Sequence, residues 1–239
     1  MHDVLFTSPL VLSYTETILA CPLFKGVAPH ELKDLLGCLN VSFKSLEEGE
    51  YAFHLGDDIS YIYIVLEGAM EIAKETINGN RNIVAFLGES QLFGEGVVCT
   101  TKRLAPVSAK ATAKTMLLLI PYEKILKTCG HSCTFHHQLI RNMMLLLGEK
   151  NYVLNHKIDL LMLKGMREKL ATYLLNESNR QGSLSFNIPL SRNELADYLN
   201  VSRPSMSREL GRMRDEGLID YYKNTFKILN LNALKETCE

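Results

Sequence analysis

The hydrophobic pattern of this 239-residue chain changes its period near residue 124. From about Tyr51 to Pro121, apolar residues recur at every second position in short runs, which is typical of half-buried antiparallel strands. Turn signals separate the runs, and Asn78-Gly79 is the dipeptide that favours a tight hairpin, because both of its residues tolerate positive φ. This half of the chain is therefore predicted to form a β-sandwich or barrel.

Beyond residue 124 the period becomes helical. Two apolar stripes run along the segment 134–157, so more than one side of this helix is apolar. Either one stripe covers the β domain while the other meets a second copy of the helix, or both are buried within one chain. We expect a dimerisation helix over residues 131–158. Its expected contact residues are Leu139, Met143, Leu146 and Val153.

Composition excludes several classes of protein. With 46% hydrophobic and 22% charged residues and a net charge of -1, the chain has the composition of a globular protein and not of a disordered one. No apolar run approaches the roughly 20 residues that span a bilayer, and no secretory signal is visible, so we expect a cytoplasmic protein without a membrane partner. The six cysteines are scattered, which favours reduced thiols over a disulfide framework.

The segment after residue 190 carries the signals of two short helices. Ser191 and Glu194 form a capping box, and Asn200 tolerates the left-handed conformation that ends a helix. After a turn, Ser202 is a second N-cap candidate, and Pro204 lies in the first helical turn, where a missing N–H costs nothing. Two helices joined in this way predict a helix-turn-helix.

The second of these helices has two different sides. Met206, Leu210 and Met213 share one narrow arc, which predicts the side that packs on the first helix. Residues 201–214 hold four arginines against one acid, a local charge of +3. Arginine suits guanine edges, and hydroxyls at a helix N-terminus suit phosphates, although a solvated arginine-rich surface helix is the alternative. The predicted DNA contacts are Ser202, Arg203, Pro204, Ser205, Arg208 and Arg212.

Alternating apolar residues then flank Lys223-Asn224 and predict a β-hairpin, the wing of a winged helix. With these residues in hand, the chain resembles the Crp/Fnr family of bacterial transcription regulators over nearly its whole length. Residues 190–219, LSRNELADYLNVSRPSMSRELGRMRDEGLI, are similar to that family's DNA-binding motif. Gly56-Asp57, the run YIYIVLEG at 61–68 and Phe93-Gly94-Glu95 are similar to its cyclic-nucleotide-binding fold.

The resemblance implies an α+β protein of two domains. A β jelly-roll over residues 1–130 would sense an effector, the long helix 131–158 would dimerise, and residues 159–239 would form a winged helix-turn-helix. Arg203, Pro204 and Arg208 occupy the three family positions that reach base edges, while Ser202 and Ser205 match phosphate contacts. Family members of the cyclic-AMP receptor type carry Glu at the middle position, and proline cannot accept from a cytosine amino group, so that base preference should differ.

The sensor pocket departs from the family pattern. Cyclic-nucleotide binders in the family place an Arg and a Ser or Thr about ten residues after the Gly-Glu pair, but those positions here are Ala105 and Pro106. A cyclic phosphate buried without that cation would be poorly compensated. The candidate pocket residues are Gly94, Glu95 and Arg103, and we expect an effector other than cyclic AMP.

Metal chemistry has weak support in the sequence. Cys129, Cys133, His136 and His137 are metal- or haem-ligand types within a short stretch, but a partly exposed helix start is the simpler interpretation, and no metal site is predicted. An iron-sulfur cluster is not expected either, since only Cys21 and Cys38 lie near the N-terminus. The cofactor is left unassigned.

The predicted function is a homodimeric regulator that binds double-stranded DNA with two half-sites and is switched by a small-molecule or redox effector. RNA polymerase is an expected partner if the protein is an activator. A ligand-binding adaptor, or a haem- or metal-dependent redox sensor whose DNA binding is secondary, is the alternative. No enzyme is expected, because between residues 51 and 121 only His54 could serve a metal-dependent barrel site.

Overall fold

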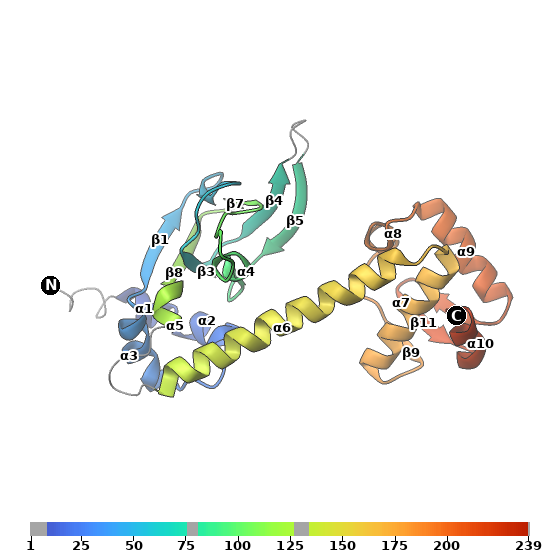
Figure 1. Cartoon of the computed structure of the whole chain (residues 1–239). Coiled ribbons are helices and arrows are strands. Elements are labelled where there is room, and N and C mark those ends of the chain that lie inside the picture. Colours follow the sequence, from blue (N-terminus) through green and yellow to red (C-terminus); the bar gives the residue numbers. More distant parts are fainter. Residues whose placement is uncertain (1–8, 76–80, 127–133, 239) are drawn as a thin grey trace. The chain divides into compact units, whose positions relative to one another are not determined.

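The computed structural model describes residues 9–75, 81–126 and 134–238, so the predicted Asn78-Gly79 turn lies outside the described residues. The chain divides into two compact units, Met1–Glu149 and Lys150–Glu239. The same division can be followed along the colours of Figure 1. It falls inside the long helix, whereas the sequence suggested a boundary at its end, near residue 158.

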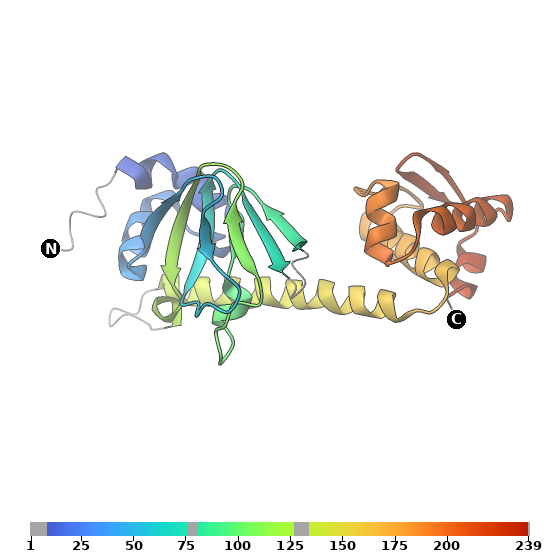
Figure 2. The ribbon, with the colours of Figure 1, turned by 90° about the horizontal axis from the view of Figure 1, so that it is seen from above.

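Unit 1 is built on two four-stranded antiparallel sheets, ordered β1-β8-β3-β6 and β2-β7-β4-β5. Their strands are β1 (Ser42–Leu46), β2 (Tyr51–Phe53), β3 (Tyr61–Glu67), β4 (Met70–Glu75), β5 (Arg81–Leu87), β6 (Leu92–Phe93), β7 (Ser108–Ala111) and β8 (Thr115–Pro121). Figure 2 shows the two sheets face to face. This is the predicted jelly-roll sandwich.

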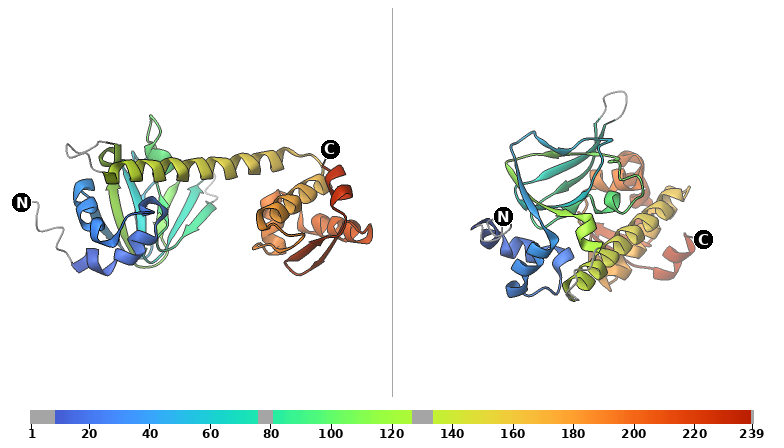
Figure 3. Two further views of the ribbon diagram at one scale, coloured as in Figure 1. Left: turned by 90° about the horizontal axis from the view of Figure 1, so that it is seen from below. Right: turned by 60° about the vertical axis from the view of Figure 1, so that its left-hand side comes forward.

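Helices complete unit 1. They are α1 (Pro9–Ser13), α2 (Thr15–Ala20), η1 (Pro22–Phe24), α3 (Pro29–Leu39), α4 (Glu95–Val98) and α5 (Tyr122–Leu126). The first helices of the chain gather at one end of the sandwich, beside the start of α6 (Thr134–Met162), in both views of Figure 3.

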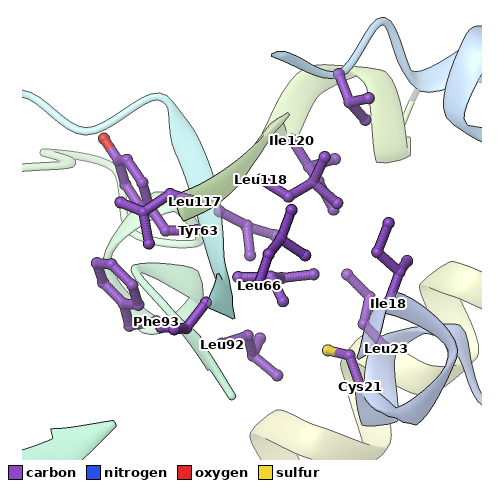
Figure 4. Packing of buried hydrophobic residues seen from close by; sticks show 14 of the residues in the cluster. Ile18, Cys21, Leu23, Tyr63, Leu66, Leu92, Phe93, Leu117, Leu118 and Ile120 are labelled. Atoms are coloured by element: carbon purple, nitrogen blue, oxygen red, sulfur yellow. The ribbon is translucent and has the colours of Figure 1, made fainter. Parts of the chain in front are cut away.

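Strand β3 is buried on both faces from Ile62 to Leu66, because it lies between the second sheet and the N-terminal helices. Figure 4 shows Leu66 on the side of Ile18 and Leu23, and Tyr63 on the other side, next to Phe93. The half-buried, alternating pattern expected over residues 51–121 therefore does not hold for β3, whose apolar run is continuous because both of its faces are covered.

The first half of α6 belongs to the core of unit 1. Leu139 and Met143 are buried in that core, and the Asn142 side chain donates to the carbonyl oxygens of Leu23 at 2.8 Å and Lys25 at 2.9 Å. These two predicted dimer contacts are therefore covered within their own chain. They pack against the β domain of their own chain, which is the alternative that the sequence left open for one of the two apolar stripes.

Unit 2 contains a three-stranded sheet, ordered β10-β11-β9, and four helices after α6 within the described residues. The elements are α7 (Met166–Gln181), β9 (Ser185–Asn187), α8 (Arg192–Leu199), α9 (Arg203–Asp215), β10 (Ile219–Tyr222), β11 (Thr225–Ile228) and α10 (Leu231–Glu236). Tyr222 pairs with Thr225, which makes Lys223-Asn224 the turn of the predicted hairpin. The winged helix-turn-helix is confirmed.

The second half of α6 lines a cavity of about 730 Å³ within unit 2. Tyr152, Val153 and His156 form its α6 wall, and Tyr173 and Tyr198 are among the residues of α7 and α8 that close it. Val153, predicted as a dimer contact, lies on the wall of this cavity and is 62% exposed. In the part of the chain that the structure describes, no helix is long and apolar enough to cross a membrane.

Candidate nucleic-acid interface

Helix α8 begins and ends as its sequence predicts. The Ser191 hydroxyl accepts from the Glu194 amide at 3.3 Å, and the Glu194 carboxylate accepts from the Ser191 amide at 2.7 Å. This backbone hydrogen bond holds the pKa of Glu194 below its usual range. Asn200 closes the helix with a φ of 53°, in the left-handed region. The capping box fixes where the turn to α9 starts.

The start of α9 differs from the prediction in one respect. Ser202 occupies the N-cap position, but its hydroxyl does not cap the helix. It makes a 2.8 Å hydrogen bond with the Ser205 hydroxyl instead. Two exposed hydroxyls therefore lie together at a helix N-terminus that no side chain caps, which is an arrangement suited to a phosphate oxygen.

The inner side of α9 is a packed surface. Met206, Leu210 and Met213 are almost fully buried, in one cluster with Leu195 and Leu199 of α8. Burying these side chains fixes which side of α9 faces outward, because the helix has one apolar stripe.

The outer side of α9 carries the predicted arginines. Arg203, Arg208 and Arg212 are all exposed. Arg208 donates to the Ser205 hydroxyl at 3.2 Å, and Arg212 forms a 3.3 Å ion pair with Glu209 on the same helix. The Arg212 side chain is 70% exposed, and an ion pair that solvent reaches in this way is weak, so these guanidinium groups keep the freedom to bind another anion.

A further arginine positions the wing, and sequence analysis missed it. The guanidinium of Arg192 lies 4.8 Å from the ring centre of Tyr221 and 4.6 Å from that of Phe226. Burial lowers its pKa, and one of its nitrogens, Nη1, is buried without a hydrogen-bond partner. Arg192 thus joins the first turn of α8 to the β10–β11 hairpin by cation–π contacts.

The three candidate sensor residues lie at the start of α4 and in the segment between α4 and β7. Gly94 has a φ of 86°, and a Cβ there would lie 3.1 Å from the Tyr61 carbonyl oxygen, so this position needs glycine. Glu95 is buried at the start of α4. Arg103 lies 3.7 Å from Glu123, with its guanidinium 5.6 Å from the Tyr122 ring centre, and is thus engaged beyond the end of β8.

Aromatic rings fill the interior of the sandwich at this end. Phe53, Tyr63 and Phe93 form a cluster with ring centres 5.0 to 5.9 Å apart. Burial raises the pKa of the Tyr63 hydroxyl to about 12. Ala105 is buried and Pro106 exposed, so neither supplies the missing cation.

The structure describes two of the four residues considered as metal ligands. Cys129 and Cys133 lie outside the described residues. His136 is buried, with Nε2 3.1 Å from the Lys124 carbonyl oxygen and 3.9 Å from the Cys38 sulfur, whereas His137 is exposed. Over residues 9–75, 81–126 and 134–238, no group of three or more potential ligands is arranged to hold a metal ion.

Comparisons with known proteins agree with both units. Residues 43–132 match the model of the cyclic nucleotide-binding domain, and residues 168–237 match that of the Crp-like helix-turn-helix domain. The transcriptional activator protein FnrA of Stutzerimonas stutzeri is 29% identical over 192 residues, 78% of this chain and 76% of that protein. The fumarate and nitrate reduction regulatory protein of Vibrio cholerae is 26% identical, covering 81% and 77%.

A solved structure extends the likeness to the whole fold. The catabolite activator protein of Thermus thermophilus superposes with a TM-score of 0.52 at 28% identity, over 91% of this chain and 98% of that one. The jelly-roll, the long helix and the winged helix-turn-helix occur in the same order. The chain is a DNA-binding, signal-responsive transcription regulator and belongs to the Crp/Fnr family.

Proposed function

We propose that this regulator acts as a homodimer, each copy of which reads one half-site of a two-fold DNA operator through α9. The observation that carries the proposal is the orientation of this helix. Its apolar stripe is buried, which leaves its arginines exposed on the opposite side. The proposed contacts remain those expected from the sequence, Ser202, Arg203, Pro204, Ser205, Arg208 and Arg212.

The chemistry of this surface assigns different roles along α9. Arg203 and Arg208 are proposed to read bases, because a guanidinium fork fits the O6 and N7 acceptors of guanine. Ser202 and Ser205 are proposed to bind a phosphate at the uncapped helix N-terminus. Arg212, two turns further along, is a phosphate contact in this arrangement. Such contacts fix register, while the base contacts give specificity.

The proposed dimer interface is an apolar seam along α6. We define it by residues separated alternately by four and three positions, the heptad spacing of a two-stranded coiled coil. The seam consists of Ile140, Met144, Leu147, Asn151, Leu154, Ile158 and Leu161. Met144, Leu154 and Ile158 are exposed at 70%, 58% and 48%, and the only polar member is Asn151. A second copy presents the same repeat, so that Asn151 meets its counterpart in a parallel, in-register pair.

The proposed effector is a small molecule or redox signal other than cyclic AMP. Arg103, the nearest cation that could replace the missing arginine, pairs instead with Glu123 and Tyr122. The activator named among the relatives supports transcription activation, with RNA polymerase as partner, and a cytoplasmic location is part of the proposal.

Selection of bound DNA from a random duplex pool tests the DNA-binding proposal. The expected result is a two-fold site whose half-sites lie about one helical turn apart. Arg208→Ala should then weaken binding by about 1 to 3 kcal/mol and relax the preference at one base pair. Arg180→Ala is the matched control, because it removes an exposed arginine of α7 that pairs with Glu177. A loss that is equal on all sequences would make Arg208 a phosphate contact.

A further inference from the structure

One arginine outside the DNA-facing surface holds α9 at two points. Arg167 Nε lies 2.6 Å from Glu209 Oε1, and its two terminal nitrogens each lie 2.7 Å from an oxygen of Glu216. Arg167 is in the first turn of α7, directly after the break that follows α6. No local sequence pattern assigns it a role, because its partners are 42 and 49 residues away along the chain.

The geometry makes this contact stronger than an ordinary surface pair. The fork of the guanidinium matches the Glu216 carboxylate with two parallel hydrogen bonds, and a third bond goes to Glu209. The Glu209 side chain is only 13% exposed. Hydrogen bonds to Glu216 and Glu209 raise the pKa of Arg167 above its usual value, so its charge is permanent.

The two oxygens of Glu209 bind two different arginines. Oε1 faces Arg167 at 2.6 Å, whereas Oε2 faces Arg212 at 3.3 Å. The closer contact belongs to Arg167, and the Arg212 side chain is 70% exposed. The charge of Glu209 is thus largely neutralised by Arg167, on the side away from Arg212. The longer contact leaves Arg212 only weakly bound to Glu209.

We infer that Arg167 is a positioning residue for DNA binding, because it neutralises Glu209 and thereby leaves Arg212 available to a DNA phosphate. This inference rests on the proposed role of the outer side of α9. Without Arg167, Glu209 would have Arg212 as its nearest cation, and the stronger pair would oppose transfer of that guanidinium to phosphate. The acid would also repel the DNA backbone.

The test measures the affinity for the selected DNA site over a range of salt concentrations. Arg167→Gln should weaken binding about tenfold and reduce the slope of log K against log salt by about 1, since one phosphate contact is lost. Glu209→Gln in the same chain should restore both values. Arg167→Gln should have little further effect in an Arg212→Gln background, because both changes remove the same contact. Arg180→Gln is the charge-matched control, with no change expected.

The outcomes separate this inference from the proposal on which it rests. If the unmodified protein binds no selected DNA, the proposed function fails. If the unmodified protein binds but Glu209→Gln does not rescue Arg167→Gln, Arg167 serves only the folding of unit 2 and the inference is overturned. An unchanged salt slope in Arg167→Gln overturns it as well. Thermal unfolding of each variant shows whether a loss of affinity follows a loss of folded protein.

Discussion

The double substitution Leu154→Ala and Ile158→Ala should dissociate the proposed dimer without unfolding the chain. Both side chains are about half exposed on the second half of α6, so the partner would cover the remaining half. Full burial of such a side chain is worth about 1.5 to 3 kcal/mol, which leaves about 0.7 to 1.5 kcal/mol for each one at the interface. Alanine is the best helix former, so α6 itself should persist.

Four such side chains meet in the dimer, two from each copy. Their loss should cost about 3 to 6 kcal/mol, which raises the dimer Kd by about 10² to 10⁴. Sedimentation velocity over a range of protein concentrations measures this constant. Binding to a full two-fold DNA site should weaken towards that of a single half-site, because the linkage between the two reading helices is lost.

Val153→Ala is the matched control for this experiment. Val153 is 62% exposed on the same stretch of helix, but it faces the cavity of unit 2 and not the seam. Its substitution should leave the dimer Kd unchanged. The seam assignment is refuted if Val153→Ala weakens the dimer as much as the double variant does, or if the double variant sediments as the unmodified protein.

Three shorter predictions concern capping, pH and the effector. Ser191→Ala should lower the free energy of unfolding by about 1 kcal/mol in a urea titration, because the first turn of α8 loses its cap, and an unchanged midpoint would contradict this. Hydrogen bonds from Ser191 and Arg167 hold the pKa values of Glu194 and Glu216 below the usual range of a glutamate in the folded state. Their stabilisation is thus fully present above the unfolded pKa and lost as the pH falls through the lowered folded pKa, which urea titrations from pH 6 to pH 3 should show as a decreasing midpoint. Calorimetry with cyclic AMP should give no heat of binding, and tight binding that Arg103→Ala abolishes would reverse our assignment of the sensor loop.

The helix-turn-helix was predictable residue by residue because its determinants are local. Ser191, Glu194 and Asn200 set the limits of α8 through hydrogen bonds and dihedral angles within a few residues of each terminus. The inner side of α9 follows from one apolar stripe, since the helix has a single core to contact. The exception is Ser202. Its hydroxyl could bind either a backbone amide of α9 or the Ser205 hydroxyl, and it binds the Ser205 hydroxyl. Local pattern does not decide between two such partners.

Contacts between distant segments could not be predicted in this way. Arg167 and Arg192 each bind groups more than 25 residues away, on helices and strands whose arrangement only the fold determines. A charged residue in the first turn of a helix is also common on a solvated surface, so neither arginine carries a distinguishing signal. The position of Arg103 is similar, since its pairing with Glu123 depends on where β8 ends.

The long helix shows why periodicity alone does not assign partners to the apolar stripes of α6. Its apolar residues serve three surfaces: Leu139 and Met143 pack in the core of unit 1, Val153 faces a cavity of unit 2, and Leu154 and Ile158 are exposed on the seam. An α-helix has 3.6 residues per turn, so two apolar stripes that are separated by less than 180° around the helix axis give one broad apolar pattern in the sequence. Spacing does not separate them, because the stripe through Leu139 and Met143 also repeats in alternate steps of four and three. Exposure does, since Leu139 and Met143 are buried whereas Leu154 and Ile158 are about half exposed. The dimer Kd of the Leu154→Ala and Ile158→Ala double variant, compared with that of Val153→Ala, therefore shows which side of α6 contacts a second copy. The substituted positions lie close together along the helix but on different sides of it.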